Sequence, residues 1–242
     1  MSGPTAFRNR DETAFPAYDH PAYRSTQLRH PKEPRQSLEH TISEVTGPGP
    51  ALAEVRPEDA DLTTNAGTGS EAIGERIIVT GRVLDEDGTP LARTLVEVWQ
   101  CNAAGRYVHG RDQHPAPLDP NFIGVGRCIT DEHGVYRFTT IRPGAYPWRN
   151  HPNAWRPAHI HFSLFGPAFV TRIITQMYFP GDPLHELDPI MGSIPQEHWS
   201  RVIATYDHSV TQEEWALGFR WDIVLRGPDA TPFESGGAGA LA

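Results

Sequence analysis

Residues 76–101 read RIIVTGRVLDEDGTPLARTLVEVWQC and contain two runs rich in branched apolar residues. Such residues favour extended strands, and the Asp87-Gly88 pair between the two runs is typical of a tight turn. The stretch therefore predicts two strands joined by a turn. Because a strand needs hydrogen-bonding neighbours, the rest of the chain has to supply the remainder of a sheet.

Further strand-like segments follow on the C-terminal side. Alternation with a period of two continues through residues 122–141, FIGVGRCITDEHGVYRFTTI, with a second turn at 132–134. Later candidates are HIHFSLFG (159–166), TRIITQMYF (171–179), RVIATY (201–206) and FRWDIVLRG (219–227). Short strands with regular turn signals and little helical periodicity are typical of a β-sandwich. We expect an all-β fold, a β-sandwich of mostly antiparallel strands.

Three regions are expected along the chain. Residues 1–75 are rich in proline, glycine and charge, which predicts an extended N-terminal arm. Residues 76–228 hold the strands of the sandwich, and residues 229–242 end in ESGGAGALA, which predicts a flexible tail. Residues 180–199 form a long connection with a single helical turn, and connections of this length in compact domains are often functional.

Composition restricts the kinds of partner. The formal net charge of -9 and the isoelectric point near 5.7 argue against general binding to nucleic acid or to an anionic membrane. Cys101 and Cys128 are the only cysteines, so a thiolate zinc cluster is excluded and a disulfide framework is not expected. No apolar stretch has the length of a signal peptide core or a membrane span. We expect a soluble, cytoplasmic chain whose partner is a small molecule or another protein.

His159 and His161 lie two residues apart in the strand candidate RPAHIHFSLFG, residues 156–166. Successive side chains of a strand point to opposite faces, so both imidazoles project from one face while Ile160 and Phe162 project from the other. An isolated pair of this kind is more often structural than metal-binding. The pair alone therefore does not establish a metal site.

Tyr107 and Tyr146 are two further candidate ligands, and each lies in loop-like sequence beside glycine or proline. Either tyrosine taken alone is better explained as a packed aromatic residue. Taken with the two histidines, they suggest a trivalent hard cation such as Fe(III), because phenolate is a hard anionic oxygen donor. A phenol loses its proton near pH 10, so only a strongly charged metal would hold two phenolates at pH 7.

Four motifs carry a resemblance to a known family. They are YRSTQLRHPK (23–32), GRYVHGRDQHPAPLDPNFIGVGR (105–127), DEHGVYRFTTIRPGAYPWRN (131–150) and WRPAHIHFSLFG (155–166). The set resembles the intradiol ring-cleaving dioxygenases and spans about residues 23–227. The resemblance implies cleavage of 3,4-dihydroxybenzoate between its hydroxylated carbons with O2, giving 3-carboxy-cis,cis-muconate.

The resemblance also implies a cofactor and a partner. One non-haem Fe(III) is expected on Tyr107, Tyr146, His159 and His161. Tyr146 and His161 would be its axial ligands, with Tyr107 and His159 equatorial beside a hydroxide. A homologous alpha chain that lacks the iron ligands would complete the pocket in a hetero-oligomer. This chain, which has all four residues, would be the iron-bearing one.

Roles for individual residues follow from charge and from the resemblance. A catechol chelates after losing two protons, which a departing hydroxide and a departing Tyr146 can accept without changing the net charge of the site. Tyr146 is therefore expected to be the displaceable ligand and base. Arg156 is expected to stabilise negative charge on the substrate. The remaining candidates are Gln176 as a catalytic polar contact, Trp148 and Ile190 as pocket walls, and Tyr23 as a partner of the substrate carboxylate.

Two other functions remain open from the residues alone. Residues 81–107 and 130–144 also resemble transthyretin-like modules with binding roles, although such a module has no need for the two tyrosines and the RPAHIHF motif. A zinc hydrolase could use the two histidines and a third ligand, but the tyrosine pair would then be unexplained. Histidines without a partner at metal-ligand spacing are expected at the surface: His109, His114, His151, His185, His198 and His208.

Overall fold

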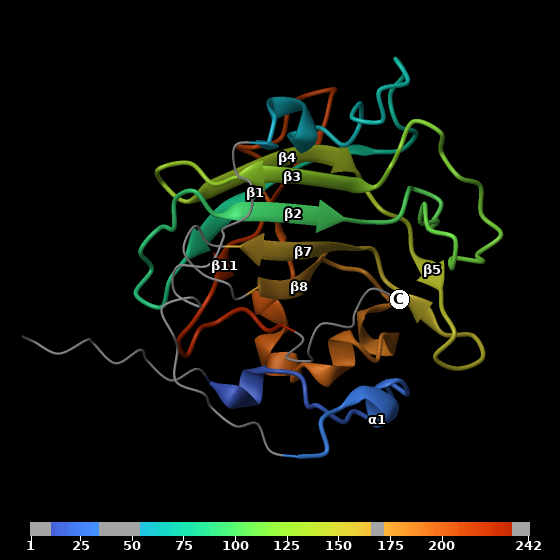
Figure 1. The fold of residues 1–242 in the computed structure, drawn as a ribbon, viewed down its shortest axis with the longest axis vertical. Helices are drawn as coiled ribbons and strands as arrows, with labels where there is room; N and C mark the ends of the chain where they lie inside the picture. The colour runs from blue at the N-terminus through green and yellow to red at the C-terminus, as the bar shows by residue number, and fades with distance from the viewer. Residues whose placement is uncertain (1–10, 34–53, 166–171, 234–242) are drawn as a thin grey trace, which may run out of the picture.

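A computed structural model describes residues 11–33, 54–165 and 172–233 (Figure 1). The longer strands are β1 (Arg76–Leu84), β2 (Leu95–Trp99), β3 (Val125–Ile129), β4 (Val135–Ile141), β7 (His159–Phe165) and β8 (Arg172–Tyr178). The shorter strands are β5 (Tyr146–Pro147), β6 (Trp155–Arg156), β9 (Thr205–Tyr206), β10 (Leu217–Arg220) and β11 (Ile223–Val224). The described helical segments are α1 (Thr26–Arg29) and the 3-10 turns η1 (Glu12–Ala14), η3 (Pro57–Ala60), η4 (His185–Leu187), η5 (Met191–Ser193) and η6 (Gln196–Arg201).

The strands form two larger sheets and one small hairpin. One sheet has the order β11-β1-β10-β9, with β4 also paired to β1, and the second has the order β3-β2-β7-β8. Strands β5 and β6 pair with each other. Strand β1 runs parallel to β10 and β11, whereas the other strand pairs in the described residues are antiparallel. The expected sandwich of mostly antiparallel strands is confirmed.

The core lies between the two sheets and uses alternate residues of their strands. It includes residues that are at most 2% exposed, such as Ile77, Val79, Val96, Val98, Phe138, Ile160, Phe162 and Met177. Burying such side chains stabilises the fold by roughly 1.5–3 kcal/mol each. Because Ile160 and Phe162 of β7 face this core, the intervening residues of β7 face outward from the sandwich. The functional side chains are on that outer face.

The strand predicted at 219–227 is interrupted after Arg220 and resumes at Ile223. Alternate residues on both sides of the interruption are buried, since Trp221 is 3% exposed and Ile223 is fully buried. A hydrogen bond between a side chain and the backbone causes the interruption. The backbone N–H of Arg82 on β1 donates to the carboxylate of Asp222 at 2.8 Å, so a side chain takes the place of a backbone acceptor in the ladder.

The predicted strand at 201–206 is shorter in the structure, because η6 extends to Arg201 and only Thr205–Tyr206 forms β9. The connection at 180–199 also differs from the single helical turn expected there, since it contains η4, η5 and the start of η6. Its buried residues Met191 and Ile194 pack with Tyr178 at the end of β8. The connection thereby covers the outer side of the second sheet.

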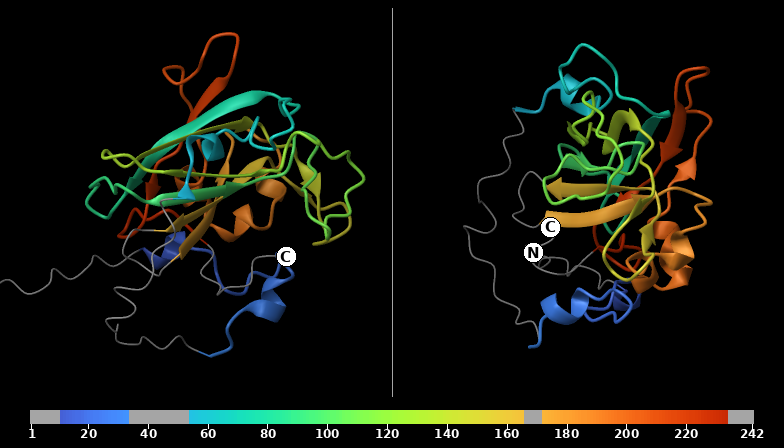
Figure 2. Two further views of the ribbon diagram at one scale, coloured as in Figure 1. Left: turned by 45° about the horizontal axis from the view of Figure 1, so that its top comes forward. Right: turned by 90° about the vertical axis from the view of Figure 1, so that its right-hand side faces the viewer.

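Residues 11–33 of the predicted arm lie on the same side of the molecule as η4–η6, whereas residues 54–75, which include η3, lie at the opposite end beside β3 and β4 (Figures 1 and 2). Phe15 meets Phe233 edge-on with ring centroids 5.0 Å apart, and Ala230 is buried beside them. Residues 1–10 and 34–53 of the predicted arm and 234–242 of the predicted tail are outside the described residues. The region boundaries at 75 and 228 stay predictions. No helix in the described ranges has the length and apolarity needed to cross a membrane.

Candidate active site

Strand β7 places His159 and His161 on the outer face of the second sheet. In the register of that sheet His161 lies between Trp99 of β2 and Gln176 of β8, and His159 lies opposite Tyr178. The ring of His161 stacks on that of Trp99, with the ring centroids 4.8 Å apart and an interplanar angle of 3°. Pairing on both sides fixes the strand, so the two imidazoles are held on rigid backbone.

The orientation of the His159 ring is set by its own chain. Nδ1 lies 2.7 Å from the carbonyl oxygen of Pro157, which can only accept a hydrogen bond. Nδ1 therefore carries the proton, and the lone pair of Nε2 points to the other side of the ring. This is the arrangement in which a histidine is ready to bind a metal.

Tyr107 is positioned by a compact loop between β2 and β3. The buried side chain of Asn102 organises this loop, because its Oδ1 accepts the backbone N–H groups of Ala104 and Arg106 at 3.0 and 2.9 Å. The backbone N–H of Tyr107 donates to the carboxylate of Asp112 at 2.8 Å. These contacts fix the backbone from which the phenol projects.

Gly105 lets the Tyr107 loop approach the backbone that carries Tyr146. It has φ +77°, and a Cβ atom there would lie 2.3 Å from the carbonyl oxygen of Ala145. The backbone N–H of Gly144 donates to the carbonyl of Asn102 at 3.0 Å. Only glycine allows this approach, which brings two segments about forty residues apart side by side.

Tyr146 begins the hairpin of β5 and β6 and pairs directly with Arg156. Arg156 precedes the first residue of β7 by three positions, so this pairing places Tyr146 beside the start of β7. The Tyr146 ring meets the Tyr107 ring edge-on with centroids 5.5 Å apart, and the Tyr146 hydroxyl lies 3.4 Å from Nε2 of His159. The His159 and His161 rings are 4.9 Å apart. All four predicted ligand residues are therefore neighbours in the structure.

Burial determines the charge of these four side chains. It raises the pKa of Tyr107 well above the usual range, and the neighbouring Tyr146 adds to the effect. Burial also raises the pKa of Tyr146. Burial, followed by the charge of Arg156, lowers the pKa of His159 well below the usual range and that of His161 to about 3. Without a bound cation all four side chains are neutral at pH 7.

The donor set fits a ferric ion. Two neutral imidazoles and two phenols converge, and the buried hydroxyl of Tyr107 has no hydrogen-bond partner among the residues that the structure describes. A buried polar atom without a partner needs an explanation, and a hard cation that binds phenolate supplies one. Within the described residues no group of three or more His, Cys, Asp or Glu could hold a metal, so a zinc site of that composition is not formed there.

Arg156 is the centre of a buried polar network beside the four residues. Its Nη1 lies 3.0 Å from Nε2 of His159 and 3.5 Å from the Tyr146 hydroxyl. On the other side its Nη2 donates to Asp188 at 2.9 Å and to Gln176 Oε1 at 2.6 Å. Arg156 is 3% exposed and Asp188 is 1% exposed, so this is a buried ion pair. The guanidinium is held with its charge directed at the site.

Asp188 was not among the residues singled out from the sequence. It lies in the long connection with no local motif, and the acidic residues around it give no reason to choose it. Tyr178 was also missed, although its hydroxyl accepts a hydrogen bond from Arg156 at 3.0 Å. The sequence could have indicated Tyr178 through its position, because it lies two residues after Gln176 and therefore on the same face of its strand. That face also presents His161.

The other predicted residues lie at different distances from this centre. Gln176 contacts Arg156 directly. The Cζ atom of Arg156 lies 5.9 Å from the centroid of the Trp148 ring. The ring centroids of Trp148 and Tyr23, which belongs to the arm, are 5.5 Å apart. Ile190 is half-buried, and its backbone N–H donates to the carboxylate of Asp188 at 3.2 Å. These contacts bring Tyr23, Trp148 and Ile190 next to the network but do not establish their roles.

The histidines expected at the surface need one correction. His109, His151 and His208 are exposed, and His114 and His198 are half-buried. His185 is only 7% exposed and lies against the rings of Tyr178 and Trp199. Burial lowers its pKa. The expectation for His185 was wrong because η4 turns it inward onto the end of β8.

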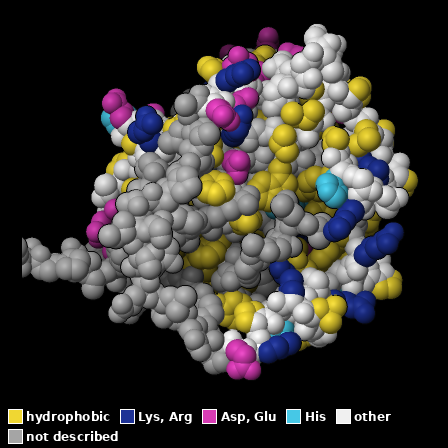
Figure 3. Space-filling model, in the orientation of Figure 1, with side chains coloured by type: hydrophobic (Ala, Val, Ile, Leu, Met, Phe, Trp, Pro, Cys, Tyr) yellow, Lys and Arg dark blue, Asp and Glu magenta, His cyan; other side chains and the backbone are white. Residues whose placement is uncertain are grey.

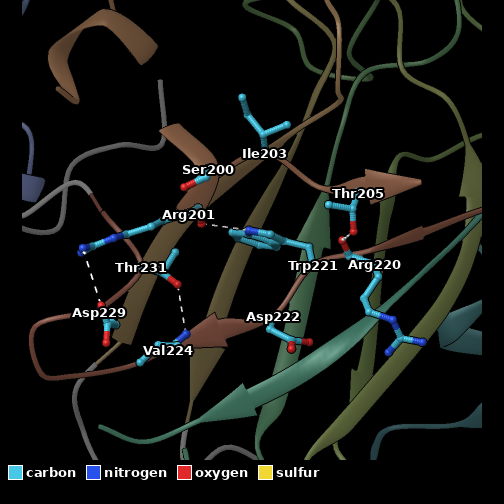
Figure 4. Close-up of a pocket in the computed structure, with 10 residues that line it drawn as sticks. All are labelled: Ser200, Arg201, Ile203, Thr205, Arg220, Trp221, Asp222, Val224, Asp229 and Thr231. Carbon is cyan, nitrogen blue, oxygen red and sulfur yellow. Dashed lines mark hydrogen bonds and ion pairs between the residues drawn. The ribbon is translucent and has the colours of Figure 1, made fainter. Parts of the chain in front are cut away.

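A separate hollow of about 250 Å³ lies between η6, β9, β10 and β11 (Figure 4). It is lined by Ser200, Arg201, Ile203, Thr205, Arg220, Trp221, Asp222, Val224, Asp229 and Thr231. The indole N–H of Trp221 donates to the carbonyl of Arg201 at 3.0 Å. None of the four candidate metal ligands lines this hollow, so it is not part of the candidate active site.

Comparison with known proteins gives consistent results. A family model described as dioxygenase matches residues 47–227, and one described as protocatechuate 3,4-dioxygenase beta subunit N terminal matches residues 8–41. The protocatechuate 3,4-dioxygenase beta chain of Burkholderia cepacia is 57% identical over 234 residues, covering 97% of this chain and 100% of that protein. The corresponding alpha chain from Burkholderia cepacia is 26% identical over 204 residues, covering 81% of this chain and 98% of that protein.

The solved structures show the same fold. The 3-chlorocatechol 1,2-dioxygenase of Rhodococcus opacus 1CP superposes with a TM-score of 0.54 at 24% identity, covering 71% of this chain and 66% of that one. At this level of identity the likeness concerns the arrangement of strands. The arrangement is the β-sandwich described above.

Proposed function

The chain belongs to the family of intradiol ring-cleavage dioxygenases, and we propose that it is the iron-bearing beta subunit of a protocatechuate 3,4-dioxygenase. It cleaves protocatechuate (3,4-dihydroxybenzoate) with O2 between the two hydroxylated carbons and gives 3-carboxy-cis,cis-muconate. The observation that carries the proposal is the convergence of two phenols and two imidazoles on the outer face of β7. The family assignment expected from the sequence motifs is confirmed.

Proteins of this family use iron. We propose that a non-haem Fe(III) is held by Tyr107, Tyr146, His159 and His161. When bound, the ferric ion supplies a Lewis acid that holds the catechol and makes its ring reactive toward dioxygen. The histidines are neutral at pH 7 and can bind without losing a proton, whereas both tyrosines have to release theirs.

Tyr146 is proposed as the side chain that makes room for the substrate. Because burial raises the pKa of the metal-free Tyr146, its phenolate would be a strong base once it left the iron and could take a proton from a substrate hydroxyl. The resulting phenol has a hydrogen-bond partner, since Nη1 of Arg156 can donate to its oxygen, 3.5 Å away. The Tyr107 hydroxyl has no such partner in the described part of the chain, and Tyr107 is proposed to stay in place.

Arg156 is proposed to stabilise negative charge that develops on the substrate ring and on oxygen during attack. A guanidinium remains charged at any relevant pH, and its effect is larger in a buried site than in water. The pair with Asp188 keeps this cation in place. Gln176 accepts from Arg156 through Oε1, which leaves its amide N–H groups for an oxygen of the substrate or product.

The carboxylate end of protocatechuate is proposed to lie toward the arm, between Tyr23, Trp148 and Ile190. Tyr23 carries a hydroxyl that can donate to a carboxylate, and the guanidinium of Arg29 lies 4.8 Å above its ring. Lys and Arg side chains gather on the lower right of the face in Figure 3, over α1 and the β5–β6 hairpin. Although the chain is acidic overall, this local basic surface favours the approach of an anionic aromatic acid.

A homologous alpha chain is the proposed partner, in a hetero-oligomer whose pocket it helps to complete. The match of this chain to both a beta chain and an alpha chain of the same enzyme supports this assembly. The two cysteines are free and buried, as expected in a reducing compartment, and a cytoplasmic location stays a prediction.

The function is tested by turnover of the co-purified complex under ¹⁸O-labelled dioxygen with protocatechuate as substrate. We expect one O2 consumed per substrate and both labelled atoms in the carboxylates of 3-carboxy-cis,cis-muconate. Hydrolysis of an ester substrate without O2 uptake would point to the zinc hydrolase instead. Binding of protocatechuate without any turnover would point to the transthyretin-like binding module.

A further inference from the structure

A buried asparagine side chain joins residues 22–24 of the predicted arm to the segment beside the candidate active site. Asn150 follows the β5 strand and is 3% exposed. Its Oδ1 accepts the backbone N–H of Arg24 at 3.0 Å, and its Nδ2 donates to the backbone carbonyl of Ala22 at 2.7 Å. The side-chain amide of Asn150 therefore bonds to the backbone on both sides of Tyr23. Asn150 and Ala22 are 128 positions apart in the sequence.

Further contacts make this a defined arrangement. The guanidinium of Arg24 donates to the backbone carbonyl of Asn150 at 3.1 Å, so the two segments bond in both directions. Within the arm the hydroxyl of the buried Thr26 donates to the carbonyls of His20 and Tyr23 at 3.0 and 2.7 Å. The arm therefore presents Tyr23 from a compact turn that is held to the β5–β6 hairpin by Asn150.

The consequence is a continuous row of side chains from the arm to the catalytic arginine. Tyr23 meets Trp148 edge-on with ring centroids 5.5 Å apart, and Trp148 lies 5.9 Å from the guanidinium of Arg156. Trp148 is two residues before Asn150, on the same hairpin. Displacement of Asn150 would therefore displace Tyr23 relative to Trp148 without touching the four metal-ligand candidates.

We propose that Asn150 is a positioning residue for substrate selection: it holds Tyr23 where its hydroxyl meets the carboxylate of protocatechuate. This inference rests on the proposed function, because it assigns a task at the substrate's carboxylate end. Asparagine suits the task since it offers one acceptor and two donors in a rigid plane, which matches one peptide N–H and one peptide carbonyl. Alanine offers neither group, and aspartate at pH 7 offers only acceptors.

The test uses the complex of this chain with its alpha chain and compares protocatechuate with catechol, which lacks the carboxylate. Four forms are measured for kcat, KM and visible absorption: Asn150→Ala, Tyr23→Phe, the double variant and Asn65→Ala. Asn65 is the matched control because its Nδ2 also donates to a backbone carbonyl, that of Val125 on β3 at 2.8 Å, and neither residue belongs to the contacts around Tyr23.

For Asn150→Ala we expect the KM for protocatechuate to rise about tenfold, the size of effect that follows from losing a well-placed hydrogen bond to a charged group. The kcat, the absorption spectrum and the KM for catechol should change by less than about twofold. Because Asn150 acts through Tyr23, adding Asn150→Ala to Tyr23→Phe should have little further effect. Asn65→Ala should match the unaltered protein.

Additive effects of the two substitutions, or an unchanged KM for protocatechuate in Asn150→Ala, would overturn the inference. A rise of KM for both substrates together would also overturn it, because that result describes general loosening. If Asn150→Ala does not fold, Asn150→Asp replaces it, with the same expected rise because its carboxylate faces the carbonyl of Ala22. Failure of the unaltered complex to turn over protocatechuate would instead refute the proposed function, so the two failures are distinguishable.

Discussion

The hydroxyl of Tyr107 is buried beside two imidazoles and a second phenol, and within residues 11–33, 54–165 and 172–233 it has no hydrogen-bond partner. Leaving such an atom unsatisfied costs roughly 1–3 kcal/mol, which a folded protein tolerates where function requires it. The neighbouring histidines are equally unusual, because burial holds both in the neutral form. At the scale of single residues the site is prepared for a cation that replaces phenolic protons.

The ligand assignment predicts distinct results for single substitutions. His161→Ala should lower iron affinity by at least about tenfold, since even residues that only support a ligand cost that much. Tyr107→Phe should weaken the iron site and shift the visible band, and Tyr146→Phe should retain iron while slowing substrate chelation. Metal analysis and stopped-flow absorbance measure these effects. His151→Ala, an exposed histidine, is the control, and unaltered iron content in His161→Ala would remove it from the ligand set.

The pKa shifts predict a proton count. In the metal-free chain both tyrosines are protonated because burial raises their pKa, and both histidines are neutral because burial lowers theirs. Of these four side chains, only the tyrosines should therefore release protons when Fe(III) binds, and iron affinity should rise with pH between pH 6 and 8. In a pH-stat titration, Tyr107→Phe and Tyr146→Phe should each release one proton fewer than the unaltered chain. Equal release by all three would contradict phenolate ligation.

Asp188 gives a prediction about stability. Removing one partner of a buried ion pair typically costs about 3–5 kcal/mol, because the other charge is left uncompensated. Asp188→Asn should therefore lower the free energy of unfolding by several kcal/mol and reduce kcat, as Arg156 loses its support. The exposed pair of Arg142 and Glu75, 3.7 Å apart, provides the control Glu75→Gln, with a loss below about 1 kcal/mol. A similar small loss in Asp188→Asn, measured by denaturant unfolding, would show that Arg156 is held by other contacts.

Sequence reasoning found the residues of the site that belong to short motifs. His159 and His161 are marked by their alternation, and the two tyrosines by their loops and by the family resemblance. Asp188 and Asn150 could not be found in this way, because each is defined by a partner 32 or more residues away and has no local pattern. Asn150 is a single amide in a loop that gives no hint of the arm it binds.

At the scale of elements, β7 connects core and site. Its inward residues belong to the apolar core, and its outward residues form half of the candidate metal centre. A shift of the strand by one residue would exchange these two sets, so the register with β2 and β8 is also what places the imidazoles. The sequence predicted this strand and both of its faces correctly.

The close approach of the two tyrosine loops predicts the effect of a backbone substitution. Gly105→Ala would place a Cβ atom 2.3 Å from the carbonyl oxygen of Ala145, at a residue with φ +77°. The loops must then separate, so we expect a loss of about 1–3 kcal/mol in stability and a marked fall in iron content. Gly110→Ala in the same loop meets nothing within 4 Å and should retain iron. Metal analysis of both variants decides the matter, and full iron content in Gly105→Ala would contradict the described packing.

Other elements were less predictable. The last strand is interrupted because the side chain of Asp222 accepts a hydrogen bond from the backbone N–H of Arg82. The two residues are 140 positions apart in the sequence. The connection at 180–199 forms 3-10 turns instead of a single turn, since its apolar residues pack on Tyr178. Both differences come from tertiary contacts that override local propensity.

At the scale of the whole molecule, the sandwich is a rigid support and the site lies where the β5–β6 hairpin, the long connection and the arm meet on its outer face. The all-β class and the family could be predicted from the sequence because strand alternation and motifs are local. The docking of the arm could not, because its contacts join positions 126 to 128 residues apart. These contacts place residues 22–24 of the predicted arm beside the candidate active site.

The measurement that tests the central claim most directly is the visible absorption spectrum of the co-purified complex, before and after anaerobic addition of protocatechuate. We expect a broad phenolate-to-iron charge-transfer band that shifts when the substrate binds, which would establish tyrosinate ligation of Fe(III) and substrate chelation together. A colourless protein that contains a full equivalent of zinc, with no response to protocatechuate, would contradict the account.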